Sequence, residues 1–382
     1  MSSELPESSP SPETKPPRLL SLDALRGMTI ATMILVNNPG SWSHIYPPLR
    51  HAHWHGCTFT DLVFPFFLFI VGVAIVFALG RRKEAGVPAG KILGKVVVRA
   101  SLLIVIGLFL GFYMRWDFST LRIPGVLQRI GLCYLLASFC FWFLPKRILP
   151  WLIAVLALGY WAAMTLVPVP GMPDASIDEP TRNLAAWIDQ QVLSGHMWKA
   201  ARDPEGILST IPALATTLCG ILAGLILRSE HSPNDKTRLL LLRGASLFAL
   251  GMVWSWFFPL NKPIWTSSYV LVTAGLAFLA LGLCHHAFDV RGRRRLATPF
   301  AIYGVNAILV FVGSALLVRS LAAIPMQVGG KESHLLRWLY SNSFESWIAD
   351  PKLASLAWAL SWVLTWFGVL SLLWRKRIVL KL

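Results

Sequence analysis

Residues 62–79 read LVFPFFLFIVGVAIVFAL, a run without a single charged side chain. An α-helix needs about 20 apolar residues to cross the hydrocarbon core of a bilayer, so this run predicts a membrane-spanning helix. Its apolar residues are continuous rather than alternating, which argues against an outer-membrane barrel. Nine more runs have the same character: 19–38, 96–114, 125–144, 148–167, 207–227, 239–258, 264–283, 300–317 and 353–374. We therefore expect an all-α, polytopic integral membrane protein with about ten transmembrane helices.

The composition of the 382 residues supports this class, because 55% are apolar or aromatic and only 14% are charged. Soluble domains carry about 25% charged residues, so too few are present here to cover a water-exposed surface. The five cysteines are scattered and form no CxxC pair, which argues against a disulfide scaffold. The composition thus excludes a soluble enzyme and a disordered chain.

The net charge of +16 is explained by the position of the basic residues. Most lysines and arginines fall in tails and loops on one side of the ten expected spans, for example at 81–83 and 291–295. The positive-inside rule makes this side cytoplasmic, and an even number of spans then places both termini there. The basic balance therefore predicts a lipid bilayer as partner, and no nucleic acid.

The chain is expected to form one transmembrane domain, residues 18–382, after a short tail. Residues 1–17 are rich in Ser, Pro and Glu and predict a disordered cytoplasmic tail. Long outer loops near 168–206 and 321–352 exceed ordinary connection lengths, and such loops are commonly functional. No Asn-x-Ser/Thr acceptor occurs, so the preferred address is a bacterial inner membrane.

A cluster of histidines follows the first expected span. His51, His53 and His55 stand in one outer loop, with Asp61 shortly after them and Asn37 before them. A neutral imidazole accepts protons near pH 7, a neighbouring carboxylate fixes its tautomer, and an amide can stabilise a developing oxyanion. No further carboxylate or cysteine set completes a metal signature, so no metal is expected. An interfacial role without chemistry is the favoured interpretation for His53 and His55, and residue statistics alone place His51 no higher.

Several other polar residues are candidates for binding. Asp23 and Arg26 lie three residues apart within the first span, where a structural ion pair is favoured over a direct role. The candidates for binding an anionic cofactor are Arg122, Gln128, Arg129 and Arg26. The candidates for binding substrate are Asp203, Glu205, Asn261, Trp265 and Asn306. Each set also has a structural alternative. The Arg122 group could pack against Asp61 or a neighbouring span. Asp203 and Glu205 could be favourable charges at a helix N-terminus, and Trp265 could be an interface anchor.

The sequence around the histidines resembles a known family. The pattern SLDxxRG, then VN, then HAxWxGxTxxDLVFPxFLFIxG, is similar to the heparan-α-glucosaminide N-acetyltransferase family and its shorter bacterial relatives. The similarity continues, in the order of the family, in RIPGVLQRIGLCYL (122–135), DPEGILSTIPAL (203–214), NKPIWTSSYVL (261–271) and YGVNAILVF (303–311). These blocks cover most of the expected spans.

The resemblance implies transfer of an acetyl group from cytoplasmic acetyl-CoA to the amine of a terminal glucosamine, or a related amino sugar, on the far side of the membrane. It assigns the active histidine to His51, with Asn37 and Asp61 as the other family residues, and it implies a homodimer. His53 and His55 stand where the animal enzymes carry other polar residues. His51 would act as a base or carry the acetyl group, and the sequence does not separate these mechanisms.

A transporter of an amino sugar or related solute is the alternative function. Ten spans with buried ionisable residues suit a transporter as well as a membrane enzyme. Two features favour the enzyme: the ionisable cluster lies at the outer rim rather than the midplane, and no internal repeat is evident.

Overall fold

The computed structural model describes residues 19–114 and 116–380, and the regular secondary structure of these residues is mainly helical. The tail expected at 1–17 lies outside the described residues. The helices are α1 Leu20–Asn37, α2 Val63–Glu84, α3 Ala89–Phe112, α4 Val126–Phe143, α5 Leu149–Leu166, α6 Leu184–Leu193, α7 Thr210–Leu227, α8 Pro233–Trp254, α9 Ser267–Cys284, α10 Arg294–Val305, α11 Ala307–Ala323, α12 Leu335–Tyr340 and α13 Pro351–Arg375. The strands are β1 Pro325–Val328 and β2 Lys331–His334.

Within the described part of the chain, nine helices are long and apolar enough to cross a membrane. They are α1, α2, α3, α4, α5, α7, α8, α9 and α13. A tenth crossing is obtained if α10 and α11, which meet at an angle of 62°, count as one broken span. The expected all-α, polytopic class is therefore confirmed.

The continuous helix expected over 300–317 is wrong, because the chain breaks at Asn306. The backbone there has φ −114° and ψ 39°, outside the helical region. The Asn306 amide donates to Ile378 O (3.2 Å) and accepts from Leu380 N (2.9 Å), which binds the C-terminal segment to the break. Both sides of the break are apolar, so hydropathy alone does not locate it.

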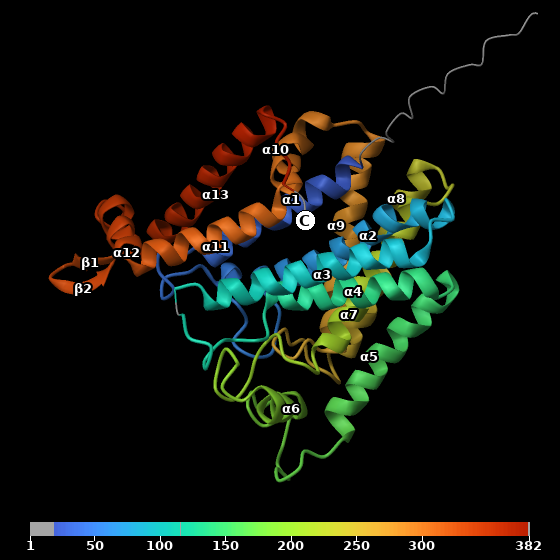
Figure 1. Cartoon of the computed structure of the whole chain (residues 1–382), viewed down its shortest axis with the longest axis horizontal. Coiled ribbons are helices and arrows are strands. Elements are labelled where there is room, and N and C mark those ends of the chain that lie inside the picture. Colours follow the sequence, from blue (N-terminus) through green and yellow to red (C-terminus); the bar gives the residue numbers. More distant parts are fainter. Residues whose placement is uncertain (1–18, 115, 381–382) are drawn as a thin grey trace, which may run out of the picture.

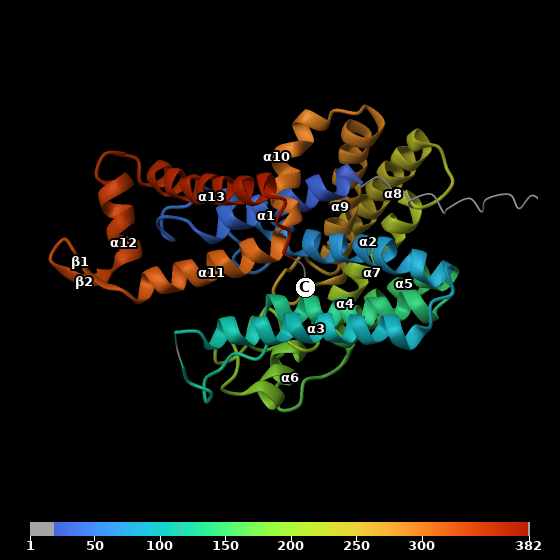
Figure 2. The same cartoon turned by 45° about the horizontal axis from the view of Figure 1, so that its top comes forward.

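Helix packing depends on close backbone approach at small residues. Figure 1 shows α10 to α13, in orange and red, extending away from the side that carries α5, and Figure 2 gives the same arrangement from another angle. α7 and α9 lie in the interior, with α2 along α7 and α8 along α9.

A Cβ atom at Gly72 would lie 1.9 Å from Thr217 O, and one at Gly220 would lie 1.9 Å from Phe69 O. Only glycine therefore permits this α2–α7 crossing.

The helices define two ends of the bundle. One end, called here the basic end, holds Arg81, Arg82 and Lys83 in the last turn of α2. Lys83 Nζ donates to Phe141 O at the end of α4, and Arg228 at the end of α7 pairs with Glu84. The opposite end, where α2 begins next to Asp61, is called the His51 end.

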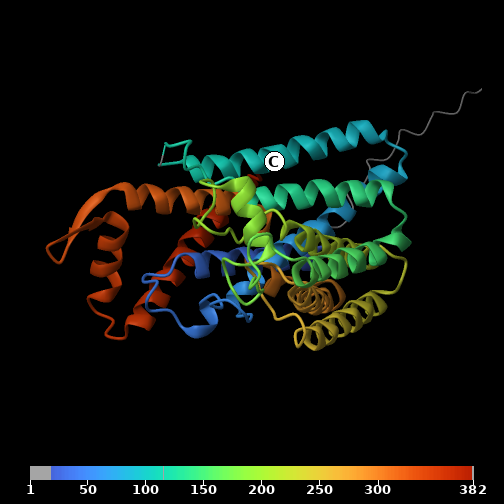
Figure 3. The same ribbon diagram turned by 90° about the horizontal axis from the view of Figure 1, so that it is seen from below.

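The two long loops are folded. The segment between α5 and α7 contains α6, which begins where Asn183 Oδ1 accepts from Ala186 N (3.0 Å), and it lies at the bottom of the view in Figure 1. The segment between α11 and α13 contains the antiparallel pair β1–β2, with Pro325 opposite His334, followed by α12. Figure 3, seen from below, shows this second segment projecting beyond the helices.

Candidate active site

His51 and Asp61 form a close pair at the His51 end. His51 Nδ1 lies 2.6 Å from Asp61 Oδ1. The His51 side chain is 49% exposed, whereas that of Asp61 is 1% exposed. The pair thus combines a buried carboxylate with an accessible imidazole.

Asp61 is oriented by the backbone around it. Its Oδ2 accepts from Ala52 N and Thr58 N, both at 3.0 Å, and Thr58 Oγ1 also lies 3.0 Å away. The Tyr269 hydroxyl of α9 donates to the Asp61 carbonyl oxygen (2.5 Å). These contacts use Oδ2 and the backbone, so that Oδ1 faces the imidazole.

This geometry determines which nitrogen of His51 is available for chemistry. A carboxylate accepts hydrogen bonds, so Nδ1 carries the proton and donates a hydrogen bond to Asp61. In the neutral imidazole Nε2 is then unprotonated. His51 can therefore accept a proton or attack a carbonyl through Nε2.

Lys262 is a third member of this cluster, and sequence reasoning missed it. Its Nζ lies 3.2 Å from His51 Nδ1 and 3.5 Å from Asp61 Oδ1. Burial lowers the pKa of Lys262 from its ordinary value, while the charge of Asp61 opposes that change. A signal was present, because Lys262 is the only charged residue between the expected seventh and eighth spans and directly follows Asn261.

The other two loop histidines have different surroundings. His55 Nε2 lies 2.9 Å from Asp178 Oδ1, and its Nδ1 lies 3.3 Å from Asn261 Nδ2. His53 is exposed and has no hydrogen bond or ion pair with any described residue. The three imidazoles therefore do not converge on one point.

The side chains of Asn37 and Asn261 differ in their exposure and in their hydrogen-bond partners. Asn37 ends α1 and is exposed, and the structure describes no hydrogen bond between its side chain and His51. Asn261 is buried, and its Oδ1 accepts from Ile264 N (3.0 Å) while its Nδ2 reaches His55. Asn261 thus shapes the loop that presents Lys262.

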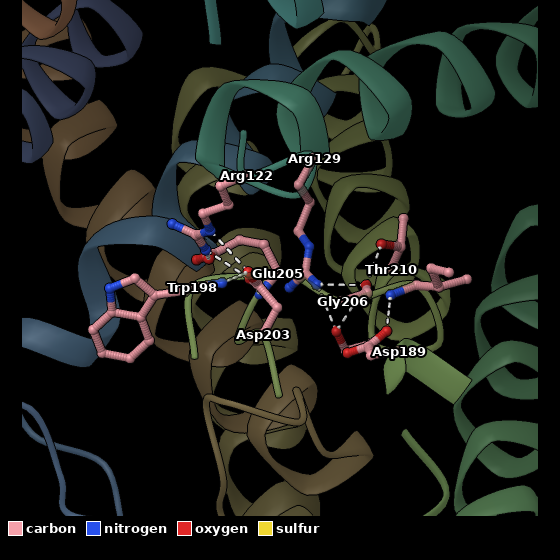
Figure 4. A network of polar contacts seen from close by, with 10 residues as sticks. Arg122, Arg129, Asp189, Trp198, Asp203, Glu205, Gly206 and Thr210 are labelled. Carbon is pink, nitrogen blue, oxygen red and sulfur yellow. Dashed lines mark hydrogen bonds and ion pairs between the residues drawn. The ribbon is translucent and has the colours of Figure 1, made fainter. Parts of the chain in front are cut away.

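Arg122 pairs with the two expected substrate-binding acids rather than with Asp61. Its Nε and Nη2 donate to Asp203 at 2.8 and 2.6 Å, and Nη2 also pairs with Glu205 (Figure 4). Burial opposes the charge of Asp203, but the hydrogen bond and charge of Arg122 hold its pKa below the usual value. Arg122 is therefore already neutralised by protein carboxylates.

Arg129 lies deeper, between the Arg122 cluster and Asp189 (Figure 4). It is 1% exposed, and its Nη2 donates to Gly206 O (3.0 Å) and to Ser209. Its Nε and Nη1 atoms have no hydrogen-bond partner among the described residues. A buried guanidinium with unused donors is costly, so these atoms mark a place where a polar group would be stabilised.

Trp265 and Gln128 are packed in the interior. Trp265 is 1% exposed, its Nε1 donates to Thr216 Oγ1 (3.2 Å), and the Arg129 guanidinium lies 5.3 Å from its ring centroid. The Trp265 ring is therefore enclosed by protein in the structure, and substrate binding by Trp265 stays a prediction. Gln128 is buried on α4 and lies against Gly107 of α3.

Asp189 of α6 is a second residue that sequence reasoning missed. Its Oδ1 accepts from Ile207 N (2.9 Å), which ties α6 to the segment before α7. Burial raises its pKa to about 6. An acidic residue within the apolar stretch 184–193 was the available signal.

Arg26 and Asp23 confirm the expected ion pair within α1. Arg26 Nη1 lies 3.0 Å from Asp23 Oδ1 and 3.3 Å from Gly304 O of α10. The pair thus joins α1 to α10, as a structural role requires.

The part of the chain that holds His51 and Asp61 is similar to known proteins. Residues 18–189 match the family model described as heparan-alpha-glucosaminide N-acetyltransferase, catalytic. The human heparan-alpha-glucosaminide N-acetyltransferase is 32% identical over 359 residues, 78% of this chain and 53% of the human protein. The mouse protein is 32% identical over 361 residues, 78% of this chain and 54% of its own length. The chain spans about half the length of these relatives. The region that matches the family model includes His51 and Asp61. The chain is thus similar to the heparan-α-glucosaminide N-acetyltransferase family.

Proposed function

We propose that this protein is a membrane-embedded acetyltransferase. It moves an acetyl group from cytoplasmic acetyl-CoA to the amine of a terminal glucosamine, or a related amino sugar, on the outer side. The observation that carries the proposal is the His51–Asp61 pair, in which a buried carboxylate fixes the tautomer of an accessible imidazole. The names of the human and mouse relatives support the reaction type.

The chemistry requires a base and a polarised thioester. An amino sugar arrives as an ammonium ion, and Nε2 of His51 takes one of its protons. The free amine attacks the thioester carbonyl, the C–S bond breaks, and the departing thiolate takes the proton from His51. The amide nitrogen loses its second proton to solvent as the amide forms. In the alternative route, Nε2 attacks the thioester first, the C–S bond breaks with loss of the CoA thiolate, and the acetyl group then passes from the imidazole to the amine.

The unused donors of Arg129 support a role in holding the donor. Nε and Nη1 would hydrogen-bond the thioester end or another oxygen of acetyl-CoA, since a guanidinium binds such oxygens strongly. Arg122 is a weaker candidate for binding acetyl-CoA, because it is already paired with Asp203 and Glu205. Arg26 is weaker because it pairs with Asp23, and Gln128 is weaker because it is buried on α4. Asp203 and Glu205 would contact the acceptor amine only if the amine displaced the Arg122 guanidinium from them.

The charge distribution supports the direction of transfer. The positive-inside rule supports a cytoplasmic position for the basic end with Arg81, Arg82 and Lys83. In this proposal both termini lie on the cytoplasmic side and His51 lies on the outer side. We also propose that the protein lies in a bacterial inner membrane and forms a homodimer. Light scattering of the purified protein tests the dimer.

A nanodisc assay with labelled acetyl-CoA and glucosamine tests the proposal. We expect labelled N-acetylglucosamine from the wild type and from His53→Ala, which alters an exposed imidazole of the same loop, but none from His51→Ala. Full activity in His51→Ala would refute the role of His51. Acid quenching before glucosamine is added separates the two routes, because only the acetyl-imidazole route leaves label on His51.

A further inference from the structure

Lys262 approaches the cluster from a part of the chain distant in sequence. It lies in the loop between α8 and α9, 211 residues from His51, and its side chain is 19% exposed. Its Nζ faces the Nδ1 side of the imidazole, where Asp61 Oδ1 already accepts the Nδ1 proton. Nδ1 therefore has no lone pair for Lys262, and the contact between the two nitrogens is electrostatic.

We propose that Lys262 is a positioning residue whose ammonium group shares Asp61 with His51 and thereby keeps the His51 imidazole neutral. The inference deepens the proposed function, which needs an unprotonated Nε2. A buried carboxylate alone would stabilise an imidazolium beside it and so remove the base. A cation 3.5 Å from the same carboxylate offsets this effect.

The other ionisable groups around the cluster do not replace Lys262. The charge of Glu205 acts on Lys262 together with that of Asp61, and both favour the charged form of Lys262. Burial raises the pKa of the Cys57 thiol to about 12, so it is neutral near pH 7. Arg50, next to His51 in sequence, donates to Ser43 O (3.3 Å) instead. Among the described residues, Asp61 and Lys262 are thus the charged groups that contact His51 Nδ1.

Diethylpyrocarbonate labelling tests the inference without any acetyl transfer. The reagent modifies unprotonated imidazoles, and peptide mass spectrometry separates His51 from His53 and His55. We expect the pH midpoint of His51 labelling to rise by about one pH unit in Lys262→Met and in Lys262→Gln, because a neighbouring positive charge has been removed. Lys262→Arg keeps the charge and should retain the wild-type midpoint.

The matched control is Lys331→Met, which removes a lysine from the exposed strand β2. An unchanged midpoint in Lys262→Met and Lys262→Gln, both folded by size-exclusion chromatography, would overturn the inference. Failure of the wild type to acetylate glucosamine would refute the proposed function but would leave this midpoint readable. In an active protein, Lys262→Gln should lose activity at pH 6 and recover it at pH 8.

Discussion

The Nδ1 atom of the half-exposed His51 lies 2.6 Å from Oδ1 of Asp61, a carboxylate that is almost wholly buried. Asp61 is held by the backbone N–H groups of Ala52 and Thr58, and its hydrogen bond in turn orients the imidazole of His51. The Tyr269 hydroxyl on the Asp61 carbonyl connects this arrangement to an interior helix. The pair therefore presents Nε2 at a fixed position while remaining accessible to substrate.

Asp61→Asn should remove tautomer control with little change in shape. The introduced amide can donate to Nδ1 of His51, which would place the imidazole proton on Nε2 and block it as a base. We expect acetyl transfer to fall by roughly 100-fold to 10,000-fold in the nanodisc assay. Retained monodispersity would show that the fold survives, and activity within a few-fold of wild type would contradict the assigned role.

Arg122→Met should destabilise the His51 end. The change leaves Asp203, whose side chain is 0% exposed, and Glu205 without their cation. Breaking such a buried pair costs about 3 to 5 kcal/mol. Arg182→Met is the matched control, because its pair with Asp174 is exposed and is worth about 1 kcal/mol at most. Equal unfolding temperatures for both variants would contradict this account.

Asp189 should make stability depend on mildly acidic pH. Its pKa is about 6 in the folded protein against an ordinary value of 3.8, so between these values the folded state binds a proton that the unfolded state has released. Stability therefore decreases as pH rises from about 4 to 6 and is then constant. Asp189→Asn should flatten this dependence, as measured by thermal unfolding across that range. A wild-type profile in the variant would show that another group titrates.

Asn306→Ala should release the C-terminal segment from the helix break. Two hydrogen bonds to Ile378 and Leu380 are lost, each worth about 1 kcal/mol. We expect faster tryptic cleavage after Arg375 and Lys376. Asn342→Ala, which removes an exposed bond to Trp338 O, should cleave at the wild-type rate. Identical rates for Asn306→Ala and wild type would mean that the segment is held by other contacts.

The spans could be predicted from the sequence because bilayer thickness sets the length of an apolar helix. Their ends depend on local features that hydropathy does not register. α8 begins at Pro233, well before the apolar run at 239–258, because a charged first turn continues the helix. α9 begins only at Ser267, since Trp265 has φ 52° and lies outside the helical region. The break at Asn306 depends on a hydrogen bond partner 72 residues away.

The candidate site was predictable where its residues are close in sequence. His51 and Asp61 are 10 residues apart in one motif, and Asp23 and Arg26 are 3 apart. The pairing of Arg122 with Asp203 spans 81 residues, and that of Lys262 with His51 spans 211. Such pairs are set by helix packing, which composition and spacing do not reveal.

Sealed proteoliposomes with one protein orientation would show whether an acetyl group crosses the membrane with His51 as the acting residue. Labelled acetyl-CoA is supplied at the basic end and glucosamine at the His51 end. We expect labelled N-acetylglucosamine on the glucosamine side with wild type and none with His51→Ala. Glucosamine that crosses unmodified, at equal rates in both proteins, would refute acetyl transfer and favour a transporter.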